Sequence, residues 1–266
     1  MGNFYILGDP KKLTDMIRYL AIVTIIGLLS GVIGTTAGGL SVVFIKNIEN
    51  RLLSILLGFS AGVMVSITMV ELIPEAIEEG SILTAVFGLI LGIGIVGMID
   101  VKFPHKHFSF DSNGDTERAK YLKTGILLSI GIAMHNLPEG VAIGTSFIVS
   151  YELGLGLAGL MAIHNFPEGM AVGAAMSIGK IKASRIIKIT ALAGLPMGLG
   201  AFIGALLGGV SDLALSIGLG FAGGAMLYIV FDELIPDAHR RIKGHAAIIG
   251  ILSGIIIGVI FINLLH

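Results

Sequence analysis

The sequence predicts an all-α integral membrane protein that crosses the bilayer eight times and is built as an inverted-topology internal repeat. Of its 266 residues, 55% are hydrophobic and only 13% are charged, whereas soluble domains carry roughly 25% charged residues. Eight long apolar stretches and two pairs of repeated motifs are the other observations behind this prediction. Since the mean hydropathy is +0.95, we expect residues 1–266 to form one polytopic transmembrane domain whose surface largely faces the lipid bilayer.

The eight predicted spans each contain about the 20 apolar residues that a membrane helix needs. The first, third and last are plainly apolar, the second and seventh end in Glu-Leu-Ile-Pro, and the fourth and fifth carry a His-Asn motif. The sixth is rich in glycine, and Gly-x-x-x-Gly spacings, which allow helices to pack closely, recur in several spans. The predicted ranges are 18–45, 52–74, 81–100, 123–149, 153–177, 186–209, 213–236 and 246–265.

The positive charges predict which side of the membrane faces the cytoplasm. Among the 17 Lys and Arg residues, only Lys11, Lys12 and Arg18 fall on one side of the predicted spans, and the other 14 fall on the opposite side. Such a bias places the richer side in the cytoplasm, so both termini are expected outside the cell, in a multi-pass protein of the plasma membrane. The long connection 101–122 is then a flexible cytoplasmic loop, and we interpret its His residues, His105 and His107, as solvated side chains rather than metal ligands.

One phrase occurs twice in the middle of the chain. Residues 134–145 read MHNLPEGVAIGT and residues 163–174 read IHNFPEGMAVGA, with seven of twelve positions identical. Both copies lie inside apolar stretches, where polar and ionisable groups are costly and mark functional sites. We therefore interpret their shared polar residues as candidate ligands of a divalent metal ion: His135, Asn136, Glu139, His164, Asn165 and Glu168.

The spacing within each motif supports a metal site. His and Glu lie four residues apart, and therefore on one face of a helix, and the proline between them, Pro138 or Pro167, interrupts the hydrogen-bond ladder and bends the helix. Imidazole nitrogen and carboxylate oxygen together suit Zn²⁺, Fe²⁺ and Mn²⁺. The alternative is that these groups only bond across helices, which the repetition of the frame disfavours. The two Asn residues are either ligands or groups that orient their neighbours.

A second pair of motifs predicts the inverted symmetry. Residues 59–76, in the second predicted span, match residues 221–238, in the seventh, at nine of eighteen positions. Spans that are an odd number apart cross the membrane in opposite directions, as do the fourth and fifth. Inverted repeats are typical of transporters that open one central site alternately to each side.

This outer repeat contributes candidate residues for a cation pathway. Glu71 matches Glu233, and Met64 matches Met226. We expect Glu71 near the outer mouth, and Asp232 and Glu233 near the inner mouth, to attract or relay cations. The alternatives are that these carboxylates are interfacial charges at helix ends, and that Met64 packs in the core instead of contacting a metal.

The residues that the chain lacks limit its chemistry further. It has no Cys, so disulfides, thiol catalysis and Cys-zinc sites are excluded, and no basic patch of the kind that binds nucleic acid. No prosthetic group is expected, because Zn²⁺ or a related divalent cation is the bound substrate of a transporter rather than an enzyme. An intramembrane metal-dependent hydrolase is the alternative, although the H-E-x-x-H motif is absent. A second alternative is a divalent-cation channel that uses the same ligands.

With these motifs the chain resembles the Zrt/Irt-like (ZIP) family of divalent-metal transporters, especially its bacterial zinc-uptake branch. The resemblance rests on HNLPEG and HNFPEG in the fourth and fifth spans, ELIPEA in the second, and a variable cytoplasmic loop after the third. It implies import of Zn²⁺, and of Fe²⁺, Mn²⁺ or Cd²⁺, through a binuclear site formed by the six motif residues, with Glu139 and Glu168 bridging the metals, often in a homodimer. That branch usually carries a Glu before a Pro in the sixth span, but here Leu195 precedes Pro196.

Overall fold

The computed structural model describes residues 10–45, 49–102 and 117–265, and every regular element in these ranges is a helix. The predicted all-α class is therefore confirmed. In chain order the elements are α1 (Pro10–Phe44), α2 (Asn50–Ser66), the π-helix η1 (Ile67–Leu72), α3 (Ile73–Glu79), α4 (Ile82–Lys102), α5 (Glu117–Val149), α6 (Tyr151–Ile178), α7 (Ala183–Gly208), α8 (Asp212–Ile229), the π-helix η2 (Val230–Leu234), α9 (Ile235–Arg241) and α10 (Ala246–Leu265).

These elements form eight long rods, because α2, η1 and α3 are continuous, as are α8, η2 and α9. Within the described ranges, seven of the rods are long and apolar enough to cross a membrane. The eighth, α6, has 28 residues and is long enough to span. Its His-Asn-Phe-Pro-Glu motif lowers its mean hydropathy, so its most apolar stretch is less apolar than those of the other seven rods.

Several predicted helix ends are wrong by a few residues. The first helix begins at Pro10, not at 18, the second rod continues to Glu79 rather than to 74, and α5 begins at Glu117 rather than at 123. An apolar run marks the part of a helix inside lipid, and polar residues continue the same helix into water. The predicted loop 101–122 is correspondingly shorter, since α4 reaches Lys102, and its His105 and His107 lie outside the described residues.

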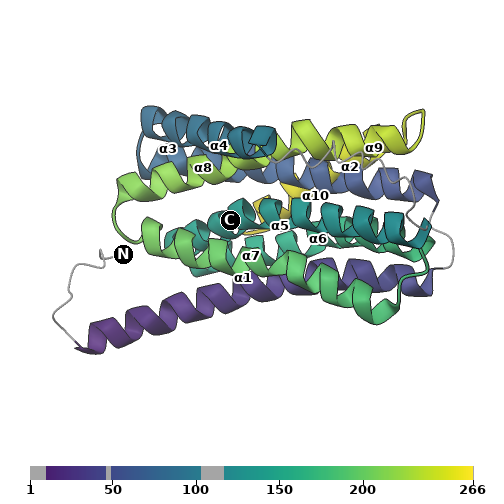
Figure 1. Cartoon of the computed structure of the whole chain (residues 1–266). Coiled ribbons are helices and arrows are strands. Elements are labelled where there is room, and N and C mark those ends of the chain that lie inside the picture. The colour runs from purple at the N-terminus through teal and green to yellow at the C-terminus, as the bar shows by residue number, and fades with distance from the viewer. Residues whose placement is uncertain (1–9, 46–48, 103–116, 266) are drawn as a thin grey trace.

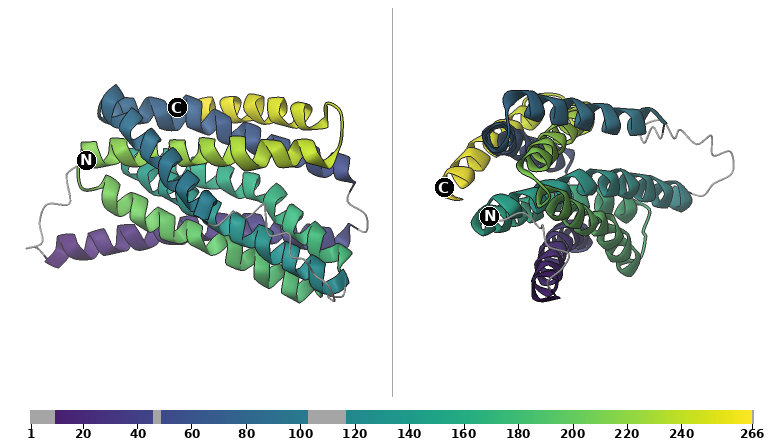
Figure 2. Two further views of the ribbon diagram at one scale, coloured as in Figure 1. Left: turned by 45° about the horizontal axis from the view of Figure 1, so that its top comes forward. Right: turned by 90° about the vertical axis from the view of Figure 1, so that its left-hand side faces the viewer.

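The rods pack in two layers that meet along the middle of the molecule (Figure 1). In one layer α7 packs against both α1 and α5, and α6 packs against α1 and α5; in the other, α2 packs against α10 and α4 packs against α8. The right-hand view of Figure 2 shows the two layers from one end of the molecule. Contacts of α2 with α6 and of α5 with α8 join the layers, so the His-Asn motifs on α5 and α6 face the junction.

The outer repeat of the sequence reappears as a repeated set of contacts. We call the register that pairs 59–76 with 221–238, extended along the flanking helices, the outer alignment. Ser54 Oγ donates to the carbonyl oxygen of Ala238 at 2.7 Å, and its equivalent Ser216 Oγ donates to that of Ala76 at 2.6 Å. The start of each rod thus lies against the end of the other, so the two rods run in opposite directions. Both copies also contain a π-helix at the same position, η1 and η2, a feature that is frequent at functional sites.

Close glycine contacts repeat in the same way. A Cβ on Gly58 would lie 2.5 Å from the carbonyl oxygen of Ala247, and a Cβ on Gly220 would lie 2.5 Å from that of Ala85. These two contacts are one contact with the halves of the chain exchanged, since the outer alignment pairs the two glycines with each other and the two alanines with each other. Glycine is required here because α2 and α10, like α8 and α4, approach closely enough for backbone to touch backbone.

Candidate metal centre

All six polar residues of the central motifs are buried, with at most 5% of any of them exposed. Unpaired polar groups are expensive in such surroundings, so their partners decide what the site can do. The structure divides the six by their contacts into a compact three-residue group, two asparagines held by α7, and one histidine that points to the other layer.

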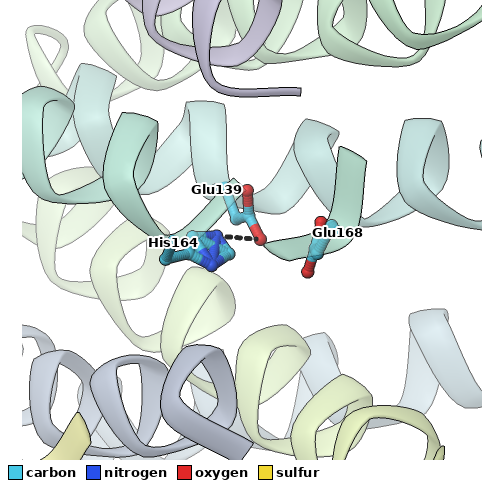
Figure 3. A group of neighbouring side chains, drawn as sticks. All are labelled: Glu139, His164 and Glu168. Carbon is cyan, nitrogen blue, oxygen red and sulfur yellow. Dashed lines mark ion pairs between the residues drawn. The ribbon is translucent and has the colours of Figure 1, made fainter. Parts of the chain in front are cut away.

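The compact group consists of Glu139 on α5 and of His164 and Glu168 on α6, whose ligand atoms all lie within 4.8 Å of one another. Figure 3 shows the three side chains converging from the two helices, with His164 Nε2 3.1 Å from Glu139 Oε1. Among the described residues, Glu139 Oε2 and both oxygens of Glu168 have no hydrogen-bond partner. Two buried carboxylates beside an imidazole form a donor set that a divalent cation neutralises and satisfies.

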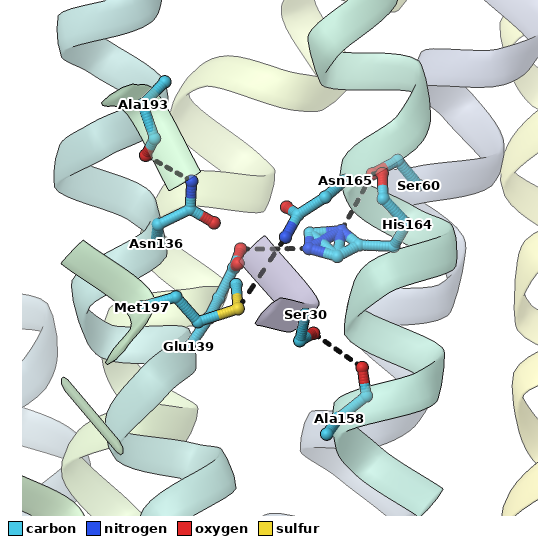
Figure 4. Close-up of polar contacts among 9 residues, drawn as sticks. All are labelled: Ser30, Ser60, Asn136, Glu139, Ala158, His164, Asn165, Ala193 and Met197. Atoms are coloured by element: carbon cyan, nitrogen blue, oxygen red, sulfur yellow. Dashed lines mark hydrogen bonds and ion pairs between the residues drawn. The ribbon is translucent and has the colours of Figure 1, made fainter. Parts of the chain in front are cut away.

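Ser60 contacts both the backbone carbonyl and the imidazole of His164. Ser60 Oγ donates to the carbonyl oxygen of His164 at 3.1 Å, and it also lies 3.1 Å from Nδ1 of the same residue (Figure 4). When the hydroxyl donates its one proton to the carbonyl, Nδ1–H is the donor in the second contact. The lone pair of Nε2 then faces a carboxylate oxygen of Glu139, an arrangement that calls for a cation or a proton between them.

Helix α7 holds the amide nitrogens of both asparagines (Figure 4). Asn136 Nδ2 donates to the carbonyl oxygen of Ala193 at 2.8 Å, and Asn165 Nδ2 lies 3.8 Å from Sδ of Met197. In the described part of the chain, the Oδ1 atoms of both asparagines have no hydrogen-bond partner. The amides are thus anchored through nitrogen, and each keeps a buried oxygen that can serve a cation.

Leu195 of α7 does not take part in these contacts. The residue is 42% exposed, whereas Met197, two positions further along, is fully buried. The helix therefore reaches the centre through the Ala193 carbonyl and the Met197 sulfur. Neither residue was identified from the sequence, because a single Met or Ala in an apolar helix gives no recognisable pattern.

His135 belongs to a different neighbourhood. Its Nε2 lies 3.0 Å from Oε2 of Glu233 in η2, and Glu233 also forms a group with Asp232 and Asp100, whose ligand oxygens lie within 4.8 Å of one another. The hydroxyl of Tyr228 donates to Oδ2 of Asp100 at 3.2 Å. Asp100 was not among the residues predicted from the sequence, although a signal existed, since it is the one charged residue in the predicted third span.

A cavity of about 290 Å³ lies beside both groups, since Glu168 of one and Glu233 of the other line it. His135, Glu168, Glu233, Arg240 and Arg241 are among the residues that line it; His135 and Glu168 are buried and Arg240 is exposed, so we take the end at Arg240 as its mouth. Of the four predicted pathway residues, Glu233 lines this cavity and Asp232 neighbours Glu233, whereas Glu71, in η1, is 3% exposed and Met64 belongs to the buried apolar core of the described residues. Glu168 is therefore the member of the central group that faces this cavity.

Comparison with known proteins identifies the family. The family model described as "ZIP Zinc transporter" matches residues 102–265. Three similar proteins, each named zinc transporter ZupT, come from Chlorobium limicola (34% identity; 90% of this chain and 95% of the relative), Streptococcus mutans (32%; 91% and 97%) and Chlorobaculum parvum (30%; 92% and 97%). The matched lengths span both halves of the repeat and the two His-Asn motifs, and this chain belongs to the ZIP family of zinc transporters.

Proposed function

We propose that this protein imports Zn²⁺ across the plasma membrane and that the ion binds between α5 and α6. The observation that carries the proposal is the buried group of Glu139, His164 and Glu168, whose Glu168 lines a cavity that also reaches the exposed Arg240. Because the family is one of transporters, the hydrolase alternative falls away.

The chemistry of the central group suits a divalent cation of the first transition row. Nitrogen and carboxylate oxygen bind Zn²⁺ at about 2.0–2.2 Å, and they replace the water that the ion loses on entering the membrane. Zn²⁺ is our choice over Fe²⁺, Mn²⁺ and Cd²⁺ because the similar proteins are named zinc transporters. Protons compete for the same nitrogen and oxygen atoms, so uptake should fall as the pH is lowered.

Orientation follows from the charge at the mouth of the cavity. Arg240 and Arg241 line that mouth and belong to the side with 14 of the 17 positive residues, which we assign to the cytoplasm. The termini are then outside, and the cavity is the exit towards the cell interior. An ion leaving Glu168 would meet His135 and Glu233, which line the same cavity, and then Asp237.

A channel would use the same ligands but would conduct without a change of shape. Two features favour a carrier: the cavity contains Glu168 and extends to Arg240, and Glu71, which we expect near the outer mouth, is buried. A carrier saturates with zinc, whereas flux through an open pore continues to rise. The resemblance also implies a homodimer, which the mass of the purified protein in detergent would test.

The test of the proposal is zinc flux into proteoliposomes loaded with a metal-sensitive dye. Native protein should give saturable flux, and Glu139→Ala and Glu168→Ala should each abolish it. Glu152→Ala is the matched control, since that carboxylate lies on the same helix as Glu168 but is exposed. Undiminished flux in both site variants would place the ion path elsewhere, and non-saturating flux in native protein would favour the channel.

A further inference from the structure

We infer that Glu71 and His164 are the outward-facing counterpart of the Glu233–His135 pair and that they come together when the central site opens to the outside. This inference rests on the proposed transport function. It gives a role to Glu71, a buried carboxylate within the membrane that belongs to neither group of neighbouring ligand atoms.

The equivalence of the two pairs comes from the two alignments that relate the halves of the chain. The outer alignment pairs Glu71 with Glu233, and it also exchanges the contacts of the two serines described above. The central alignment, which pairs 134–145 with 163–174, matches His135 with His164. Applied together, the two alignments convert the observed contact between His135 Nε2 and Glu233 Oε2, 3.0 Å long, into a contact between His164 and Glu71.

The same alignments hold for the packing of the central helices. The backbone carbonyl of Met197 is the nearest atom that a Cβ on Gly140 would meet, and the carbonyl of Thr35 is the nearest for Gly169. The central alignment pairs the two glycines, and the outer alignment, continued along the chain, pairs Thr35 with Met197. The repeat is therefore a property of the three-dimensional packing, and one half offers the other a second, equivalent arrangement.

The inner cavity has an equivalent on the other side, which is closed in this structure. The open side is lined by Leu57, Ile132, His135, Glu168, Ala171 and Glu233. The two alignments convert these into residues that are at most 3% exposed: Leu219, Met161, His164, Glu139, Ala142 and Glu71. Because the repeat makes nearly the same contacts available in both arrangements, the chain can exchange one set of contacts for the other. The exchange would open the buried outer residues and close the inner cavity.

Glu71 acts as a positioning residue in this account. His164 now pairs with Glu139 and is held by Ser60, so it must turn towards η1 to meet Glu71. The pair would stabilise the outward-open arrangement just as Glu233 and His135 stabilise the inward-open one. A divalent cation that arrives from outside would then meet an imidazole and a carboxylate, as a departing one does inside.

Cysteine accessibility tests the exchange without requiring transport. Because the chain has no Cys, Ala171→Cys provides the only thiol on the inner cavity and Ala142→Cys the only thiol on its closed equivalent. Each is labelled in metal-free proteoliposomes with a membrane-impermeant maleimide applied to one face at a time. Since zinc flux is not the readout, failure of this inference and failure of the transport proposal are separate results.

The two carboxylates should have opposite effects. Glu71→Gln should slow outer labelling of Ala142→Cys by roughly tenfold, the change expected when one hydrogen bond to a charged group is lost. Glu233→Gln should slow inner labelling of Ala171→Cys and speed outer labelling of Ala142→Cys. Glu152→Gln, an exposed carboxylate change, should leave both rates as they are. The opposite signs also show that the variants are folded.

Coupling identifies His164 as the partner. Glu71→Gln added to His164→Gln should slow outer labelling no further than His164→Gln alone, because residues that act as one pair are not additive. The inference is overturned by an additive double variant, by Ala142→Cys that is never labelled from outside, or by both carboxylate variants shifting labelling in the same direction or not at all.

Discussion

The hydroxyl of Ser60 lies 3.1 Å from both Nδ1 and the carbonyl oxygen of His164. Ser60 belongs to α2, in the layer opposite α6, so one contact fixes the orientation of the imidazole and also joins the two layers. Its consequence is chemical, since it leaves the lone pair of Nε2 towards Glu139, at a distance of 3.1 Å.

Removing that hydroxyl should weaken zinc binding without removing a ligand. Groups that orient a metal-binding histidine typically contribute about 10–100-fold in affinity, so Ser60→Ala should raise the KM of zinc flux within that range. Ser253→Ala is the control, because its hydroxyl donates to the carbonyl of Gly250 within its own helix, α10. An unchanged KM in Ser60→Ala would mean that His164 is not a zinc ligand or needs no such support.

The sulfur of Met197 should contribute to the site through Asn165. Met197→Leu conserves most of the volume, and such exchanges usually cost under about 1.5 kcal/mol in stability, so the fold should be retained while the amide of Asn165 loses its 3.8 Å contact with Sδ. The expected result is a higher KM for zinc with unchanged thermal stability. Met98→Leu, at a 60% exposed position, should change neither. A stability loss with an unchanged KM would assign Met197 to packing alone.

The two mouths of the pathway should differ in charge. Asp237, Arg240 and Arg241 line the inner mouth, and the outer alignment replaces them with Glu75, Glu78 and Glu79. An acidic outer mouth concentrates cations and raises their rate of capture by about tenfold or more at low ionic strength.

Reversing this charge should therefore slow zinc uptake. The double change Glu78→Lys and Glu79→Lys should lower the initial rate at zinc concentrations below KM, and added salt should reduce the difference. Glu49→Lys, an exposed change on the assigned cytoplasmic side, should leave the rate as it is. Equal rates for the double variant and native protein at low salt would contradict a capture role.

The glycine contacts between rods should be sensitive to one added methyl group. A Cβ at Gly58 or Gly220 would lie 2.5 Å from a carbonyl oxygen, so each Ala variant should destabilise the protein by about 1–3 kcal/mol. Gly94→Ala is the control, because nothing lies within 4 Å of its added Cβ. The effect is measured as the fraction of protein that remains monodisperse in detergent after heating. A smaller loss of stability for Gly58→Ala than for Gly94→Ala would contradict the packing described.

Much of the fold could be predicted from the sequence, because a segment that crosses lipid must be apolar and helical. Apolar runs located the helices, and the matching positions of Glu71 and Glu233 exposed the repeat. The ends of the helices were less predictable, since Pro10 and Glu79 belong to helices that continue beyond the apolar run. Continuation into water depends on local backbone preference rather than on hydropathy.

The candidate site was predictable in its residues but not in its grouping. The repeated motif identified His135 and His164 equally, yet one pairs with Glu233 and the other with Glu139. This difference depends on how the two layers are placed, which a symmetric motif cannot encode. Ser60 and Met197 were not predicted as site residues, because a single Ser or Met in an apolar helix is most often a packing residue.

The most direct test of the central claim is X-ray absorption at the zinc edge, combined with counting of bound zinc, on purified protein. The account predicts a shell of nitrogen and oxygen at about 2.0–2.2 Å with an imidazole contribution, and loss of that zinc in Glu139→Ala, His164→Ala and Glu168→Ala but not in Glu152→Ala. Bound zinc with the same shell in all three site variants would contradict a site between α5 and α6.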